Sequence, residues 1–278
     1  MTSNRYKHKC TAGLTGFTLI ELMVVIGIVA VLLALIFPAV TAVKASAQRI
    51  YCANNLRHLY LANTMYADDH GYYVAASPGM IGSNNKRWHG SRPDRNKPFD
   101  DKNGPLAPYL GQTGIRHCPS FRSARKSTES HAFESGCGGY GYNSLGAGSQ
   151  TWELGLCKAA MEHGMTPSDI QKPGLTIMFA DCAFPQPYGS NPEYLVEYSF
   201  AEPFRWVFSP GSSSGFSPDP SIHFRHRGRA NVVWCDGHVS SEKMTRSGAK
   251  HFKEFNLGWF GPADNSLFTP GKETPDQR

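Results

Sequence analysis

The sequence predicts an α+β protein in which a long N-terminal transmembrane and spine helix packs on an antiparallel β-sheet head with long loops. Three features lead to this prediction. An uncharged stretch runs from Leu22 to Val43, and a helical repeat of apolar residues follows it over 44–70. Short β-rich runs separated by loops rich in Gly, Pro and Ser then occupy residues 71–278.

The uncharged stretch is long enough to cross a membrane as a helix, because a hydrocarbon core of roughly 30 Å needs about 20 apolar residues. The segment before it carries Arg5, Lys7 and Lys9 and no acid. By the positive-inside rule this flank stays cytoplasmic, so the rest of the chain is expected across the membrane after a single pass. An ordinary secretory signal is the alternative interpretation.

Residues 44–70 predict an amphipathic helix that continues the span. Its apolar face comprises Ala45, Cys52, Leu59 and Tyr66 at seven-residue spacing, with Leu56 and Ala62 between them. We expect the helix to end near Asp69, with Gly71 just beyond it. Two separate helices with a break near Pro38 are the alternative.

In the head, residues 77–108 are expected to form long surface loops, and GGYGYNS at 138–144 a short tight segment. LTIMFADCA at 175–183 is the first clear strand. The segment 221–244 predicts two strands across the turn Arg227–Ala230 and a third strand after Asp236-Gly237.

The six residues from Gly16 to Glu21 read GFTLIE and resemble the cleavage and methylation site of type IV prepilins and type II secretion pseudopilins. The resemblance implies that a prepilin peptidase cleaves after Gly16, removing a leader over 1–16, and that Phe17 is N-methylated. It also implies a helix kink near Pro38, where the proline removes a backbone donor. The transmembrane part of the mature chain would then cover 17–43.

Glu21 would be the fifth residue of the mature chain, in an otherwise apolar segment. A glutamate at the edge of a bilayer core costs on the order of 2.5–3.5 kcal/mol on insertion scales. The resemblance implies that Glu21 pairs with the amino terminus of a neighbouring subunit, which compensates part of that cost. Solvation of Glu21 by headgroups and water at the interface is the alternative.

A second resemblance lies near the C-terminus, where His226 is followed after nine residues by Asp236-Gly237. This segment, 226–237, resembles the H-X9-DG signature of a group of prepilin-like proteins, DUF1559. Other pieces occur in the order that the group shows: CANNL at 52–56, Cys118-Pro119, YGYN at 140–143 and Asp181. The resemblance covers most of the chain but gives no molecular role for the signature.

Seven cysteines are present, and Cys10 would leave with the leader. Six are expected to face an oxidising compartment and are disulfide candidates: Cys52, Cys118, Cys137, Cys157, Cys182 and Cys235. They allow 15 complete pairings. We favour Cys182 with Cys235, because each closes a strand beside an aspartate. One or two bridges with buried free thiols are the alternative.

Histidines and aspartates of the head are candidate metal ligands. A convergence of His223, His226, His238, Asp181 and Asp236 could hold zinc or calcium. Against this, Asp-Gly suits a type I′ turn, and His226 can hydrogen-bond across the hairpin. The sequence therefore predicts no metal and no cofactor, with calcium left open.

Composition and charge exclude some functions. The formal net charge is +6, and removal of the three basic leader residues leaves about +3, which is too little to indicate nucleic-acid binding. Ser144 lies outside a GxSxG frame, and no catalytic residue is predicted.

The sequence thus predicts a structural subunit, not an enzyme, whose N-terminal helix bundles with copies of itself and with other pilin-like subunits. The assembly would be a type II secretion pseudopilus or a type IV pilus-like filament. The expected location is the bacterial inner membrane with a periplasmic head, or an extracellular filament, and the prepilin peptidase is an expected partner. The alternative is a membrane-tethered extracytoplasmic binding or metal-dependent domain that uses the prepilin signal without polymerising.

Overall fold

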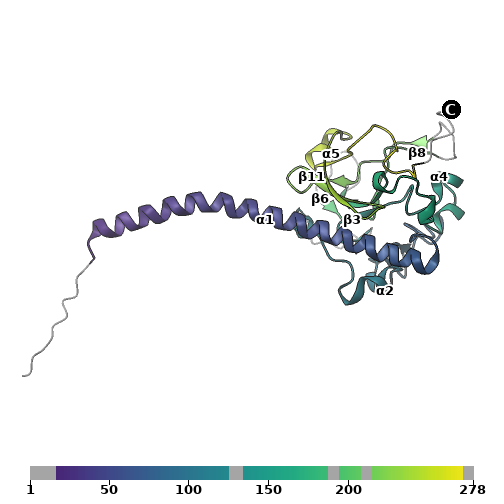
Figure 1. Ribbon diagram of the computed structural model, residues 1–278, viewed down its shortest axis with the longest axis horizontal. Helices are drawn as coiled ribbons and strands as arrows, with labels where there is room; N and C mark the ends of the chain where they lie inside the picture. Colours follow the sequence, from purple (N-terminus) through teal and green to yellow (C-terminus); the bar gives the residue numbers. More distant parts are fainter. Residues whose placement is uncertain (1–16, 125–133, 187–193, 208–214, 272–278) are drawn as a thin grey trace, which may run out of the picture. The chain divides into compact units, whose positions relative to one another are not determined.

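A computed structural model of the 278-residue chain describes residues 17–124, 134–186, 194–207 and 215–271 (Figure 1). The chain divides into two compact units, one up to Lys44 and one from Ala45 onward. The second unit contains the head together with the spine. The leader, including Gly16 and Cys10, lies outside the described residues.

Helix α1 (Leu19–His70) contains both the predicted span and the predicted spine. Its buried face comprises Cys52, Asn55, Leu56, Leu59, Ala62, Asn63 and Ala67. The apolar face that the sequence predicts is confirmed, although Ala45 and Tyr66 are only half-buried. The helix ends at His70, where the N–H of Gly71, at φ 84°, donates to the Ala67 carbonyl at 2.7 Å.

Helix α1 continues through Pro38, so the alternative of two separate helices is wrong. A kink at Pro38 stays a prediction.

The head consists of short elements, with the bounds that follow. Its helices are η1 (Asp101–Asn103), α2 (Ala107–Leu110), η2 (Gly111–Thr113), α3 (Pro119–Ala124), α4 (Thr151–Leu154), η3 (Ala159–Met161), η4 (Pro167–Asp169), η5 (Pro173–Leu175) and α5 (Lys250–Glu254). Its strands are β1 (Lys86–Arg87), β2 (Gly90–Ser91), β3 (Tyr140–Asn143), β4 (Ile177–Asp181), β5 (Phe184–Gln186), β6 (Tyr194–Val196), β7 (Phe200–Ala201), β8 (Trp206–Val207), β9 (Gly215–Phe216), β10 (Ile222–His223), β11 (Arg229–Trp234), β12 (Val239–Lys243) and β13 (Leu257–Gly258).

A five-stranded sheet in the order β12-β11-β4-β3-β7 forms the centre of the head. Its pairs are antiparallel except β3 with β7, which is parallel. The α+β class with long loops is therefore confirmed. Strand β4 was predicted, whereas β3 lies in the segment expected to be short and tight.

The buried apolar residues form two clusters, one between the spine and the sheet and one between the sheet and the C-terminal segment. Leu56 and Leu59 of the spine pack in one cluster with Met178 and Val233 of the sheet. A second cluster joins Ile177, Ala180 and Val232 of the sheet to the C-terminal aromatics Trp259, Phe260 and Phe268. Because strands β4 and β11 contribute to both clusters, their sequences are apolar on both faces.

Two buried asparagines of the spine hold it in register on strand β3. Asn55 Nδ2 donates to Tyr140 Oη, and Asn63 Nδ2 donates to Tyr142 Oη, both at 2.9 Å. Asn63 Oδ1 also accepts the Val74 N–H at 2.9 Å. Because unpaired buried amides are costly, these bonds favour one position of the helix on the sheet.

The predicted hairpin before β11 is shorter than expected. His226 and Arg229 exchange both backbone hydrogen bonds, at 2.9 and 3.3 Å, and Arg227 and Gly228 between them have positive φ, as in a type I′ turn. Strand β10, however, pairs with β13 and not with β11. The partner of β10 thus comes from distant sequence, which local patterns do not reveal.

The turn after β11 is not type I′, because Gly237 has positive φ and Asp236 does not. The Gly237 N–H donates to the Trp234 carbonyl at 2.9 Å, which closes a four-residue turn. A Cβ built on Gly237 would lie 2.5 Å from Cε1 of Tyr60 on the spine. The glycine of the signature therefore lets this turn contact the spine directly.

We expect Gly237→Ala to destabilise the head more than Gly228→Ala. Both glycines have positive φ, at 86° and 76°, so each alanine costs about 1–2 kcal/mol of backbone strain. Only Gly237 contacts a ring, which adds about 1–3 kcal/mol of overpacking, since nothing lies within 4 Å of the Cβ position of Gly228. Chemical denaturation followed by near-UV circular dichroism measures the difference, and equal losses would contradict the Tyr60 contact.

Candidate functional site

The N-terminal motif forms a capping box at the start of helix α1. The backbone N–H and the hydroxyl of Thr18 donate to Glu21 Oε2 at 2.9 and 2.7 Å, and the Glu21 N–H donates to Thr18 Oγ1 at 3.2 Å. These reciprocal bonds satisfy donors that the first helical turn leaves unpaired. Within one chain Glu21 therefore caps its own helix, a role that the Thr-x-x-Glu pattern could have revealed.

The apolar part of α1 follows this cap. Phe17 is 76% exposed, and the side chains over 19–40 are exposed as well. Helix α1 is long and apolar enough to cross a membrane. None of its most apolar stretch is buried within the chain. The helix fits membrane anchoring.

In the head, a buried polar cluster surrounds Asp181 at the end of β4. Asp181 Oδ1 accepts from Arg225 Nη2 at 2.8 Å, and Oδ2 accepts from the Asn231 N–H at 2.7 Å. His226 Nε2 lies 3.2 Å from the same Oδ2. Burial opposes ionisation of Asp181, but Arg225, His226 and Asn231 outweigh it and lower the pKa of the carboxyl.

The same histidine also faces two cysteines. His226 Nε2 lies 3.8 Å from Cys118 Sγ, and its Nδ1 lies 3.4 Å from Ser120 Oγ. One ligand atom each of Cys52, Cys118 and His226 lies within 4.8 Å of the others, and all three residues are buried. These are the described residues that could hold a metal ion.

Neighbouring side chains shift the pKa values of this cluster. Burial opposes the Cys118 thiolate, but hydrogen bonding with Cys52, together with Arg225 and His226, lowers the pKa of Cys118 to about 4. Hydrogen bonding with Cys118 and burial raise the pKa of Cys52. Burial opposes the imidazolium, but hydrogen bonds with Asp181 and Cys118 raise the pKa of His226 to about 9. The neighbouring cations thus favour the thiolate of Cys118 over the thiol.

The cluster does not have the geometry of a catalytic triad. In a triad one histidine nitrogen faces the nucleophile and the other nitrogen holds the carboxylate. Here Nε2 of His226 faces both Cys118 and Asp181, and Nδ1 faces Ser120. The arrangement suits ion pairing and metal ligation.

The five residues considered as metal ligands do not converge on one site. His223 and His226 do lie near Asp181, and His223 Nδ1 is 3.1 Å from Arg225 Nη1. Asp236 and His238 pair with each other at 2.6 Å in an exposed turn. They follow β11, whereas His226 precedes it, and six strand residues span about 20 Å. The two ends of the signature therefore belong to different sites.

The favoured disulfide between Cys182 and Cys235 is also wrong. Strands β4 and β11 are antiparallel, so their C-terminal ends lie at opposite ends of the ladder. Cys182 follows β4, whereas the Cys235 N–H donates to the carbonyl of Thr176, which precedes β4. In the described part of the chain, the six predicted cysteines are free thiols.

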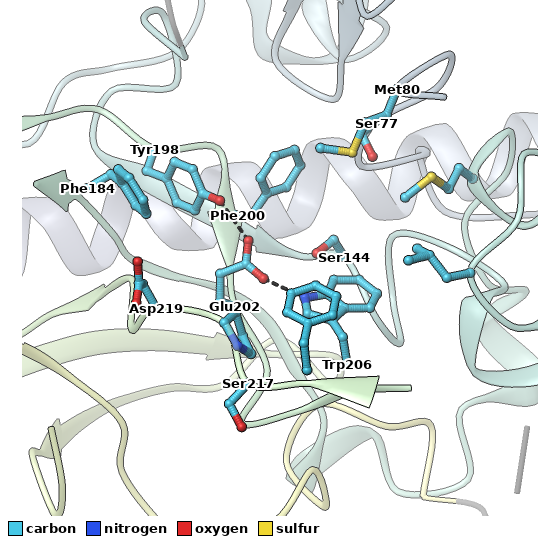
Figure 2. A pocket seen from close by; sticks show the side chains of 14 residues that line it. Ser77, Met80, Ser144, Phe184, Tyr198, Phe200, Glu202, Trp206, Ser217 and Asp219 are labelled. Carbon is cyan, nitrogen blue, oxygen red and sulfur yellow. Dashed lines mark hydrogen bonds between the residues drawn. The ribbon is translucent and has the colours of Figure 1, made fainter. Parts of the chain in front are cut away.

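A separate pocket of about 440 Å³ has Phe200 of strand β7 in its lining. Figure 2 shows the aromatic side chains of Phe184, Tyr198, Phe200 and Trp206 around the carboxylate of Glu202. Tyr198 Oη and Trp206 Nε1 each donate to this carboxylate at 2.7 Å. Burial, with the carboxylates of Glu134 and Asp219, raises the pKa of Glu202, although the two hydrogen bonds oppose the rise.

Comparison with known proteins matches the N-terminal segment. Residues 15–37 match the family model described as the prokaryotic N-terminal methylation motif. No curated protein and no solved structure was found to match the chain. The matched motif, with the apolar helix that covers most of it, supports a pilin-like exported protein that a prepilin peptidase processes.

Proposed function

We propose that this protein is a structural subunit whose N-terminal helices bundle into a type II secretion pseudopilus or a type IV pilus-like filament. The observation that carries the proposal is the methylation motif at 15–37 directly on a helix whose apolar side chains are exposed within one chain. Such a surface needs lipid or neighbouring helices around it. The protein itself performs no chemistry in this proposal, and its head lies in the periplasm.

We further propose that the chain belongs to the H-X9-DG group and that both ends of the signature have a structural role. His226 binds Asp181 of the sheet, and Gly237 packs on Tyr60 of the spine. Both ends of the signature therefore join β11 to its surroundings. In this proposal the signature stabilises the attachment of the sheet to the spine.

Processing of the N-terminus is the first test. We expect the wild-type protein to begin at methylated Phe17, and Gly16→Val to retain the 16-residue leader on most chains, because a branched side chain replaces the small residue before the scissile bond. Intact-mass measurement of the membrane-extracted protein distinguishes the two. Gly27→Val is the control, since nothing lies within 4 Å of its Cβ position. A wild-type protein that begins at Met1, or is cleaved near Pro38, would contradict the proposal.

A second candidate function, from a different class, is the binding of a compact organic cation in the pocket of Figure 2. Five aromatic residues line it: Phe184, Tyr198, Phe200, Trp206 and Phe216. Among the described lining residues there are two acids, Glu202 and Asp219, and no Lys or Arg. Aromatic faces and a buried carboxylate both favour an ammonium group.

We expect choline to bind the full-length protein and its neutral isostere 3,3-dimethylbutanol to bind at least tenfold more weakly. Glu202→Gln should weaken choline binding about tenfold, because it removes the charge while it keeps the shape of the side chain. Quenching of tryptophan fluorescence measures both affinities, with Glu254→Gln as the exposed control. Equal affinity of the wild type for the two probes would exclude this function.

A further inference from the structure

We infer that Cys52, Cys118, His226 and Asp181 form a structural zinc-binding site between the spine and the sheet of the head. Cys52 lies on the spine, Cys118 directly before α3, His226 on the turn before β11, and Asp181 at the end of β4. Four segments far apart in the sequence thus bring ligand atoms to one place. The inference is independent of the proposed filament and of N-terminal processing.

The distances suit a tetrahedral ion. With Zn–S of about 2.3 Å and Zn–N of about 2.0–2.1 Å, the ligand atoms of a tetrahedral site lie about 3.5–3.8 Å apart. Cys118 Sγ and His226 Nε2 are 3.8 Å apart, and the three ligand atoms of Cys52, Cys118 and His226 all lie within 4.8 Å of one another. Small side-chain movements would complete the geometry.

We assign Asp181 as the fourth ligand, because its Oδ2 lies 3.2 Å from the same Nε2 of His226 that faces Cys118. The ligand atoms within 4.8 Å of one another are those of Cys52, Cys118 and His226, so metal binding requires the carboxylate to move toward the two sulfurs. Arg225 and the Asn231 N–H donate hydrogen bonds to this carboxylate and orient it. Ser120 Oγ lies 3.4 Å from the other nitrogen of His226. Partners of this kind orient the ligands of zinc sites.

The charge balance and the type of ligand favour zinc over calcium. Two thiolates and one carboxylate carry three negative charges, which Zn²⁺ and the buried Arg225 together neutralise. Calcium takes six to eight oxygen ligands, whereas thiolates and imidazole are the ligands that zinc prefers. Because the four ligands are buried protein groups and close the coordination sphere, the site would be structural.

The competing chemistry is a disulfide between Cys52 and Cys118, the usual fate of two facing thiols in an oxidising compartment. A disulfide involves the two sulfurs alone, and the buried imidazole and carboxylate beside them contribute nothing to it. Zinc binding uses all four groups. For this reason we favour zinc and treat the disulfide as an outcome of the test.

The test uses full-length protein extracted in mild detergent without chelator. We expect about one zinc per chain by elemental mass spectrometry. Cys118→Ser and His226→Gln should each lower zinc occupancy at least tenfold at a fixed low Zn²⁺ concentration. Cys157→Ser is the matched control, because Cys157 lies outside the cluster and is half-buried. Zinc retained by Cys118→Ser would overturn the inference.

A second measurement does not depend on the folding of any variant. Wild-type protein stripped of metal and reduced is titrated with Co²⁺. Two thiolate ligands should give an intense sulfur-to-cobalt charge-transfer absorption that saturates at one Co²⁺ per chain and that Zn²⁺ abolishes. Absence of this absorption, or a peptide map of the exported protein that joins Cys52 to Cys118, would show that the cluster does not bind zinc.

Discussion

Replacing Glu134 by Ala is expected to destabilise the head by about 3–5 kcal/mol, since it leaves the Arg87 guanidinium buried without its counter-charge. Arg87 Nε and Nη2 donate to the carboxylate of Glu134 at 2.8 and 2.7 Å, and the two side chains are 1% and 2% exposed. The Ser199 hydroxyl also donates to Glu134 and contacts His89 Nε2 at 2.7 Å. The lost carboxylate would thus leave several buried groups unpaired.

Chemical denaturation of the full-length protein in detergent, followed by near-UV circular dichroism, measures this loss. The exposed pair of Lys250 and Glu254, 3.7 Å apart, provides the control, and Glu254→Ala should change stability by less than about 0.5 kcal/mol. Replacing both Arg87 and Glu134 by Met and Leu should cost less than Glu134→Ala alone, because no charge is then buried unpaired. If Glu134→Ala and Glu254→Ala are equally mild, the buried pair contributes little.

The long helix could be predicted from the sequence because its determinants are local. The uncharged run gives the apolar part, the repeat of Cys52 and Leu59 gives the buried face, and Gly71 ends the helix one residue after its last helical position. The loops over 77–108 were predicted only in part. Arg87 and Trp88 within them are fully buried, and their partners, Glu134 and Ser199, come from distant sequence.

Strand pairing in the head depends on contacts that the sequence does not show. Strand β3 contains Gly141 in place of a β-branched residue. Because glycine is typical of turns, the sequence of this segment does not indicate a strand. A Cβ at Gly141 would lie 2.5 Å from the backbone carbon of Phe200, so the glycine is required by the close approach of β7. The preferred disulfide was wrong for a related reason, since it ignored the antiparallel direction of β4 and β11.

The sequence predicted the types of residue in the candidate site but not the full set of residues that form it. His226 and Asp181 were singled out as metal candidates, and they do meet. The sequence indicates Cys52 and Cys118 only as disulfide candidates, because they lie 66 residues apart and outside any short metal-binding motif. Their proximity to His226 results from packing of the spine against the sheet.

Glu21→Val is expected to reduce assembly sharply while membrane insertion and cleavage persist. An apolar residue replaces a charged one at the edge of the membrane span, so insertion is unchanged or improved. The scissile bond after Gly16 is untouched, so intact mass should show the mature chain. Crosslinked ladders between subunits, and any filament, should diminish sharply, because the carboxylate proposed to compensate a neighbour's amino terminus is missing.

The capping box makes a second variant necessary, because Glu21→Val also removes the hydrogen bonds with Thr18. Glutamine at this position keeps the capping pattern but carries no charge. If Glu21 meets the amino terminus of a neighbour, Glu21→Gln should lose crosslinked ladders as Glu21→Val does. If the capping box is its whole role, Glu21→Gln should assemble like the wild type while Glu21→Val fails. Normal ladders from a correctly cleaved Glu21→Val protein would reject any role of this carboxylate in polymerisation and would favour its solvation at the membrane interface.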